Sequence, residues 1–235
     1  MEKYFDVTYI WESIPTLLPF LKVTFFVAGL SVLFGSLLGL ILAIMKLGKN
    51  KIVQKTAHGY TTILRCTPSI VLLFLIYYGV PAVVMNFGIN LTDMSPAFFV
   101  VITFTLQFGA LMSEVIRSAY ESVDKGQYEA GVSVGLSNIQ AYRRIIFPQA
   151  FVAALPNFGN ALLELMKEGA LAYTIGLIDV MGKANLIIAS NYNSHALEIY
   201  IGLSIIYWVL SIIIEQFFLK LEKIFSKGKK NLKTA

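Results

Sequence analysis

The chain has 235 residues, of which 57% are hydrophobic and 14% charged, with a formal net charge of +5. Soluble globular domains usually carry about 25% charged residues, so this composition excludes a soluble protein and indicates one integral membrane domain over residues 1–235. In such a protein basic residues report topology rather than a nucleic-acid partner, and one cysteine with two distant histidines speaks against a disulfide or a metal site.

Five apolar stretches are long enough to cross a bilayer core of about 30 Å as helices. We expect these spans at roughly residues 17–45, 69–85, 96–116, 151–178 and 199–219. The predicted fold is therefore all-α, with five transmembrane helices. A six-span alternative would divide the fourth segment at its glycines.

The first span carries Gly35 and Gly39, a pair of small residues one turn apart, with Ser31 one turn earlier. Such a stripe lets another helix approach closely. We favour packing within one subunit over a dedicated dimer face.

Basic residues gather in three places. The connector after the first span holds Lys46, Lys49, Lys51 and Lys55, and the central polar loop and the tail from Lys220 hold most of the others. By the positive-inside rule these segments lie in the cytoplasm, which puts the N-terminus outside and the C-terminus inside. We expect the connector to be a loop.

The polar loop of residues 121–150 has an unusual pattern between its apolar neighbours. It reads Glu129-Ala130-Gly131-x-x-x-Gly135, then nine residues, then Ile145-x-Phe147-Pro148. We expect two short helices at an angle. Glu129 would begin the first helix near its positive dipole end, and Gly135 would end it or allow a tight contact. Ser137 or Asn138 would cap the second helix and Pro148 would stop it.

This pattern resembles the permease subunits of ABC importers, in particular the polar amino-acid importers of the histidine and glutamine permease type. Gly131 stands where the family has Ala, and Phe147 where it has Leu. Other family-like segments run over roughly residues 15–220: they include Arg65-Cys66-Thr67-Pro68, Leu75-Ile76-Tyr77-Tyr78-Gly79, Glu114-x-x-Arg117 and Lys125-Gly126-Gln127.

The resemblance implies a type I ABC importer permease fold in a bacterial cytoplasmic membrane. It implies that the central loop docks on a cytoplasmic ABC ATPase dimer, through Glu129, Ala130, Gly131, Gly135, Ile145 and Pro148. A second permease subunit, identical or homologous, and an external substrate-binding protein would complete the importer. The chain has no GxxxxGK[ST] phosphate loop, so we expect no cofactor and no ATPase activity of its own; ATP would be bound by the partner.

Charged residues inside a span are costly in hydrocarbon and are therefore candidates for function. Glu164, Lys167 and Glu168 share one helical face of the fourth span, which Pro156, Gly159, Gly169 and Gly176 interrupt. This face could meet the ammonium and carboxylate of an amino acid, with Gln107, Ser113 and Tyr173 as weaker candidates for the substrate path. An internal Glu164–Lys167 pair or a link between subunits is the competing interpretation. Glu114 and Arg117 are expected to anchor the inner end of the third span.

Within the polar amino acids, cystine and related sulfur amino acids are one candidate substrate. An ion-coupled secondary transporter is the alternative function, but it usually shows internal repeats, which we do not find here. A non-transporting scaffold or receptor is a third possibility, against which the charges inside the spans argue.

Overall fold

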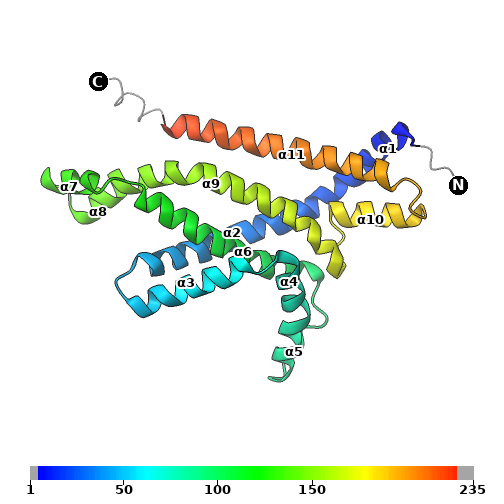
Figure 1. Ribbon diagram of the computed structural model, residues 1–235, viewed down its shortest axis with the longest axis horizontal. Coiled ribbons are helices and arrows are strands. Elements are labelled where there is room, and N and C mark those ends of the chain that lie inside the picture. Colours follow the sequence, from blue (N-terminus) through cyan, green and yellow to red (C-terminus); the bar gives the residue numbers. More distant parts are fainter. Residues whose placement is uncertain (1–4, 227–235) are drawn as a thin grey trace.

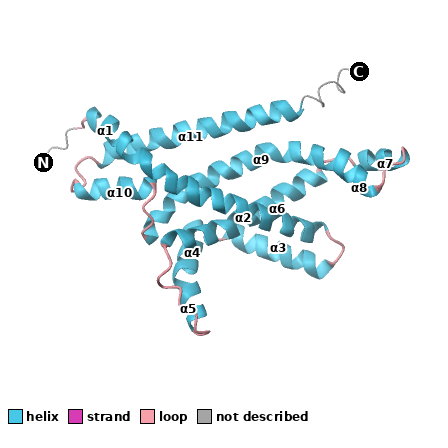
Figure 2. Ribbon diagram, turned by 180° about the vertical axis from the view of Figure 1, so that it is seen from behind, coloured by secondary structure: helices cyan, strands magenta, loops and turns pink. Residues whose placement is uncertain are grey.

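The computed structural model describes residues 5–226, and every regular element within them is helical (Figure 2). The α-helices are α1 Val7–Leu17, α2 Leu21–Leu47, α3 Lys51–Cys66, α4 Ser69–Phe74, α5 Val80–Met85, α6 Pro96–Glu121, α7 Lys125–Ser133, α8 Asn138–Ala141, α9 Phe147–Glu168, α10 Val180–Ser190 and α11 Ala196–Phe225. Short 3-10 segments at Leu18–Phe20 and Gly169–Ile175 and π-helical turns at Leu75–Gly79 and Tyr142–Ile146 join some of them into longer rods. The end of the expected inner tail, residues 227–235, lies outside the described residues.

Four of these rods are long and apolar enough to cross a membrane. They cover Val7–Leu47, Pro96–Glu121, Asn138–Ile175 and Ala196–Phe225. A fifth candidate is the pair Lys51–Cys66 and Ser69–Met85, which is bent by 105° at the intervening break. The expectation of an all-α membrane protein is confirmed, with four or five spans in the described part of the chain.

The basic connector is much shorter than expected, because most of it is helix. Asn50 caps α3 by accepting hydrogen bonds from the backbone N–H groups of Ile52 and Val53. The helix then runs to Cys66 and ends before Pro68, whose ring disfavours helical geometry in the residue before it. The prediction of a loop over residues 46–55 was therefore wrong, apart from residues 48–50.

Pro148 does not stop the second helix of the central loop, contrary to the prediction. It is the second residue of α9 and follows a π-helical turn, so the rod continues from α8 into α9. A proline ring clashes with the carbonyl four residues earlier, and the wider π turn gives that carbonyl room. The same order recurs at Leu75–Gly79, which precedes Pro81. The connector that the sequence predicts to be external also contains a helix, α10, capped by Asp179, which accepts a hydrogen bond from the N–H of Gly182.

Helices α2 and α6 cross at a point where glycine makes their backbones approach. A Cβ added to Gly39 would lie 2.6 Å from Met112 Cβ, and one added to Gly109 would lie 2.7 Å from Leu38 Cδ2. A Cβ on Gly35 would lie 3.0 Å from Phe108. The small-residue stripe therefore serves packing within the subunit, as the sequence favoured.

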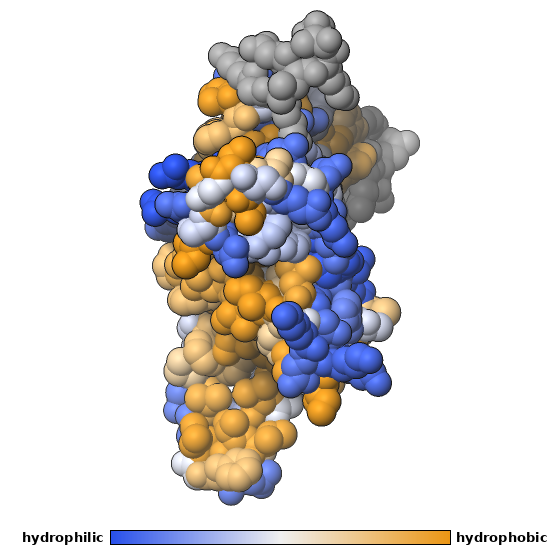
Figure 3. Space-filling model, turned by 90° about the vertical axis from the view of Figure 1, so that its left-hand side faces the viewer, coloured by the Kyte–Doolittle hydropathy of each residue, from blue (hydrophilic) through white to orange (hydrophobic). Residues whose placement is uncertain are grey.

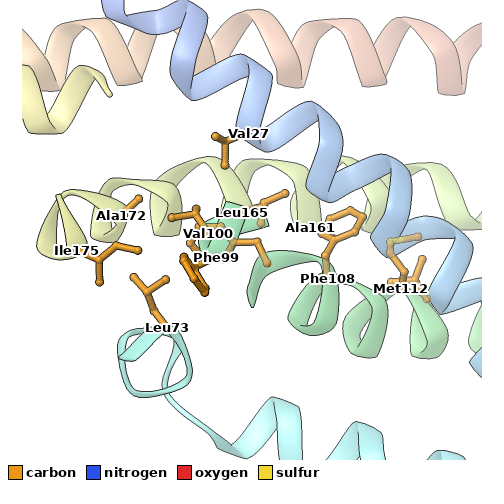
Figure 4. Packing of buried hydrophobic residues seen from close by; sticks show 12 residues of the cluster. Val27, Leu73, Phe99, Val100, Phe108, Met112, Ala161, Leu165, Ala172 and Ile175 are labelled. Carbon is orange, nitrogen blue, oxygen red and sulfur yellow. The ribbon is translucent and has the colours of Figure 1, made fainter. Parts of the chain in front are cut away.

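The main hydrophobic cluster is built around α6 (Figure 4). Phe99, Val100 and Phe108 are buried on α6 and meet side chains from α2, α4 and α9, among them Leu73 and Leu165. A second cluster joins α1, α10 and α11 around Leu17, Val180 and Ile199. Helix α6 is thus the central element of the bundle.

The ends of the helices form two groups, one at each end of the long axis of the molecule. The α7–α8 segment, the α2–α3 turn and the C-terminal end of α11 lie at one end, whereas α1 and α10 lie at the other (Figure 1). Figure 3 looks at the α7–α8 end of the molecule. Hydrophilic residues cover much of the upper middle and the right of this view, and apolar residues cover the centre and the lower left. The basic segments expected on one side of the membrane are therefore close together in the fold.

Candidate functional site

A cavity of about 770 Å³ lies where the broken α3–α4 pair meets α6 and α9. It is lined by Leu64, Arg65, Cys66, Thr67, Pro68, Ser69, Ile70, Gln107, Phe108, Leu111, Ala161, Glu164, Leu165, Glu168 and Leu171. Three of the six residues expected along the substrate path, Gln107, Glu164 and Glu168, are among them. The structure thus brings together residues that are up to 61 positions apart in the sequence.

Gln107 holds the break between α3 and α4 in place. Its Nε2 donates to Ser69 Oγ at 2.8 Å and to the Thr67 carbonyl at 3.5 Å. Its Oε1 is buried and accepts no hydrogen bond from the described chain. A buried acceptor without a partner is costly, so a hydrogen-bond donor that entered the cavity would find a favourable position here.

The cavity carries charges of both signs. Glu164 and Glu168 lie one turn apart on α9, and Arg65 lines the cavity from α3. The sequence places Arg65 in a family-like segment but does not predict it as a lining residue. The signal that could have found it is its position just before the Thr67–Pro68 break, since irregular backbone at membrane depth occurs where it lines a cavity or is buried in protein.

The other three path candidates lie elsewhere. Lys167 is exposed and does not line the cavity, and it forms no ion pair with Glu164 among the described residues. Tyr173 is 39% exposed on the 3-10 segment after α9. Ser113 is fully buried and belongs to a polar network in the C-terminal part of α6.

Lys46 is the centre of this network. Its side chain is 0% exposed, and its Nζ lies 2.7 Å from both Glu114 Oε1 and Ser113 Oγ. Arg117 binds Glu114 Oε2 at 2.7 Å and Glu121 Oε2 at 2.6 Å. The network joins α2 to the C-terminal part of α6, where Glu114 and Arg117 lie; that this part is the inner end of the third span stays a prediction. Lys46, expected in a loop, instead ends α2 as a buried charge.

The central loop folds into two short helices, which we call the knob, residues 121–146. Asp124 caps α7 by accepting from the Gly126 N–H, so Glu129 is the fifth residue of α7 and not its start, contrary to expectation. Gly135 has a φ of +88° and ends α7: its N–H donates to the Val132 carbonyl, and the following N–H donates to that of Gly131. This is a left-handed helix terminus of the kind that glycine favours.

The second helix of the knob packs against the first at Gly131. Ser137 caps α8 reciprocally with Gln140, as one of the two predicted caps. A Cβ on Gly131 would lie 2.7 Å from Ile145 Cδ1, so these two coupling candidates form the contact between the helices. Glu129 and Ala130 are exposed on α7, while Pro148 lies in the rod beyond the knob.

Tyr142 ties the knob to the ends of the long helices. Its ring packs against Tyr128 and Phe147, and its hydroxyl lies 3.3 Å from that of Tyr120 at the end of α6. At its tip the knob exposes two large apolar side chains, Val134 at 80% and Ile139 at 79%.

Comparison with known proteins agrees with this arrangement. Residues 35–226 match the family described as binding-protein-dependent transport system inner membrane component. The chain is 42% identical over 234 residues to the L-cystine transport system permease protein TcyL of Bacillus subtilis (strain 168), covering 100% of this chain and 97% of that protein. It is 36% identical over 214 residues to the nopaline transport system permease protein NocM of Agrobacterium fabrum (strain C58 / ATCC 33970), with coverage of 90% and 88%.

Among solved structures, one chain of an amino acid ABC transporter crystallised with histidines superposes with a TM-score of 0.81. It shares 31% sequence identity and is covered to 99%, with 94% of this chain matched. The fold is that of a type I ABC importer permease, as the resemblance implied, and the protein is a multi-pass inner-membrane protein. The chain belongs to the family of inner-membrane components of binding-protein-dependent transport systems.

Proposed function

We propose that this permease subunit carries polar amino acids, with L-cystine or a related sulfur amino acid as the substrate, in an ATP-driven importer. The observation that carries the proposal is the cavity at the α3–α4 break, which has charges of both signs inside a candidate span. Intramembrane charges are costly and are retained where they serve a path or a ligand. The name of the TcyL relative supports the choice of cystine.

The proposed contacts follow from the charges of the lining residues. Glu164 and Glu168 receive the substrate ammonium from α9, and Arg65 on α3 receives a carboxylate, for which its planar guanidinium is well suited. Gln107 adds an acceptor at the wall. Arg65 thereby takes the role that the sequence gave to Lys167. Cystine has two ammonium and two carboxylate groups, so a site with two acidic side chains fits it.

The knob couples this cavity to the ATPase in the proposal. The rod from Asn138 to Ile175 begins in the knob, and Glu164 and Glu168 lie on the same rod. We infer that a displacement of the knob reaches the cavity through this rod, in which the π-helical turn at Tyr142–Ile146 and Pro156 inside α9 are the places where the rod can bend. The partners are a cytoplasmic ATPase dimer that binds the knob, a second permease subunit and an external binding protein. The knob end then lies inside the cell, which places the C-terminus inside and the N-terminus outside.

Uptake by the reconstituted complex tests the proposal. A hydrogen bond to a charged group is worth about 1.5–3 kcal/mol, so Glu168→Gln and Glu164→Gln should each lower cystine uptake roughly tenfold or more at normal membrane abundance. Glu12→Gln, on the exposed side of α1, is the matched control and should leave uptake unchanged. Normal uptake in both cavity variants would refute the site.

The alternative, an ion-coupled secondary transporter, has a separate test. The purified permease is placed in liposomes without any ATPase, and an ion gradient is imposed. The proposal expects no accumulation of labelled amino acid. Accumulation under these conditions would establish the alternative and remove the need for an ATPase partner.

A further inference from the structure

Helix α3 has a polar face of which the proposed function uses only Arg65, the residue at its cavity end. Its residues alternate at spacings of four and three, which places them on one side of a helix. We call them the basic stripe: Lys51, Lys55, His58, Thr62 and Arg65. All five are exposed, while Ala57 and Thr61 on the adjacent face of α3 are buried against the bundle.

The C-terminal half of α3 is held at the depth of the middle of α6. The Tyr60 hydroxyl donates to the Leu106 carbonyl at 3.0 Å, in the middle of α6, and Thr61 Oγ1 lies 3.3 Å from Ser113 Oγ. Helix α6 is itself a candidate span. Thr62 and Arg65 therefore lie deep in the bilayer and not at its surface.

Apolar and polar exposed positions are separated on this side of the molecule. Ile41 and Ile44 on α2, and Ile52 and Ile63 on α3 itself, are exposed apolar side chains of the kind that face lipid, whereas the stripe contains no large apolar residue. Charged side chains at such depth face the interior of a bundle or water, because hydrocarbon leaves them unsolvated. Within the described residues, Lys51, Lys55 and Arg65 form no ion pair. Within the described subunit, water or a polar ligand is what can reach these side chains.

The stripe runs along α3 from the cavity to the α2–α3 turn. Arg65 lines the cavity, and Lys51 begins α3 just after the α2–α3 turn, at the same end of the molecule as the knob (Figure 1). The polar face thus leads from the cavity to that end.

We propose that the basic stripe is one wall of a water-filled exit from the cavity to the cytoplasm, and that its cations receive the carboxylates of the departing substrate. This rests on the proposed function, in which the cavity holds an amino acid. A positive wall attracts carboxylate groups and opposes cations, so the exit favours zwitterionic and acidic amino acids over those with net positive charge.

Thiol labelling tests the water-filled exit without requiring transport. The whole complex in inside-out vesicles is treated with a membrane-impermeant methanethiosulfonate cation. The native Cys66, which is exposed and lines the cavity, should react in the unmodified protein. In a Cys66→Ser background, Lys55→Cys and Thr62→Cys should react at least about tenfold faster than Ile41→Cys. The reason is that the reactive thiolate forms only where the thiol is in contact with water. Equal rates at positions 41 and 62, or no reaction at 62, would overturn the exit and would indicate that lipid or the second subunit covers the stripe.

Charge reversal tests the role of the cations. Lys55→Glu should lower the maximal rate of uptake about fivefold or more, with half-saturation unchanged, because the change lies beyond the cavity. Lys49→Glu is the matched control, since it makes the same charge change in the turn before α3 and off the stripe. Equal uptake by the two variants would overturn the carboxylate role. If the native complex takes up no amino acid while Thr62→Cys still labels, the proposed function fails and the water-filled exit remains.

Discussion

The buried Lys46 offers a sharp test of how the bundle is held together. Lys46→Met keeps the length of the side chain but removes the ammonium that contacts Glu114 and Ser113 at 2.7 Å. Breaking a buried ion pair by removing one partner costs about 3–5 kcal/mol, because the other charge is left unpaired. Here Glu114 is 21% exposed and keeps Arg117 as a partner, so we expect a smaller loss, about 2–3 kcal/mol.

Thermal unfolding of the purified subunit measures this loss. For a chain of this size about 1 kcal/mol corresponds to roughly 2–4 °C, so the midpoint should fall by roughly 4–12 °C. Lys22→Met on the same helix is the control, because Lys22 is exposed. The double variant Lys46→Met/Glu114→Gln should recover part of the loss, since no unpaired charge remains. If Lys46→Met behaves like Lys22→Met, or if the second substitution adds its own full penalty, the ion pair does not hold α2 to α6.

Two further substitutions test close packing and the knob. Gly39→Ala should destabilise the subunit by about 1–3 kcal/mol, because the added Cβ would overlap Met112. Gly29→Ala is the control and should not destabilise it, because a Cβ added there would have no atom within 4 Å. The thermal unfolding midpoints of the two variants are compared. A lower midpoint for the Gly29 variant alone would contradict the glycine crossing. Gly135→Val should cost roughly 1–2 kcal/mol locally, because φ is +88°, and should reduce co-purification of the ATPase without changing the amount of permease in the membrane. Full retention of the ATPase would argue against docking through the knob.

The spans and the knob could be predicted because their signals are local. A run of apolar residues specifies a membrane helix wherever it occurs, and Gly135 and Ser137 act on their own neighbours in the chain. Helix α3 was missed because its polar stripe makes the segment look like a loop. Its helical character follows from the apolar face that packs on the bundle, and that face is a tertiary feature.

Lys46 and Arg65 show what local patterns cannot supply. A lysine after an apolar run is usually at the membrane surface, and only the approach of Glu114, 68 positions later, makes burial of Lys46 favourable. Arg65 lines the cavity because the chain bends by 105° after it, which sets the cavity wall. Pro148 was misjudged for another reason: the π turn that accommodates it has no simple sequence signal.

The crossing of α2 and α6 determines which parts of the subunit can move. Glycine contacts and the Lys46 network fix α2 to α6, and the hydrogen bonds of Tyr60 and Gln107 add α3 and the start of α4 to the same body. Helix α9 meets this body through apolar side chains of the main cluster, among them Leu165 and Phe158, whose ring lies edge-on against Phe108.

The cavity therefore has its cation on one body and its two carboxylates on the other. A change in the angle between the bodies alters the separation of Arg65 from Glu164 and Glu168. A ligand whose own charges are a fixed distance apart can contact Arg65 and the two carboxylates at the same time only at one angle between the two bodies. Under the proposed function, a change in this angle therefore weakens the contacts of the bound amino acid with Arg65 or with the two carboxylates.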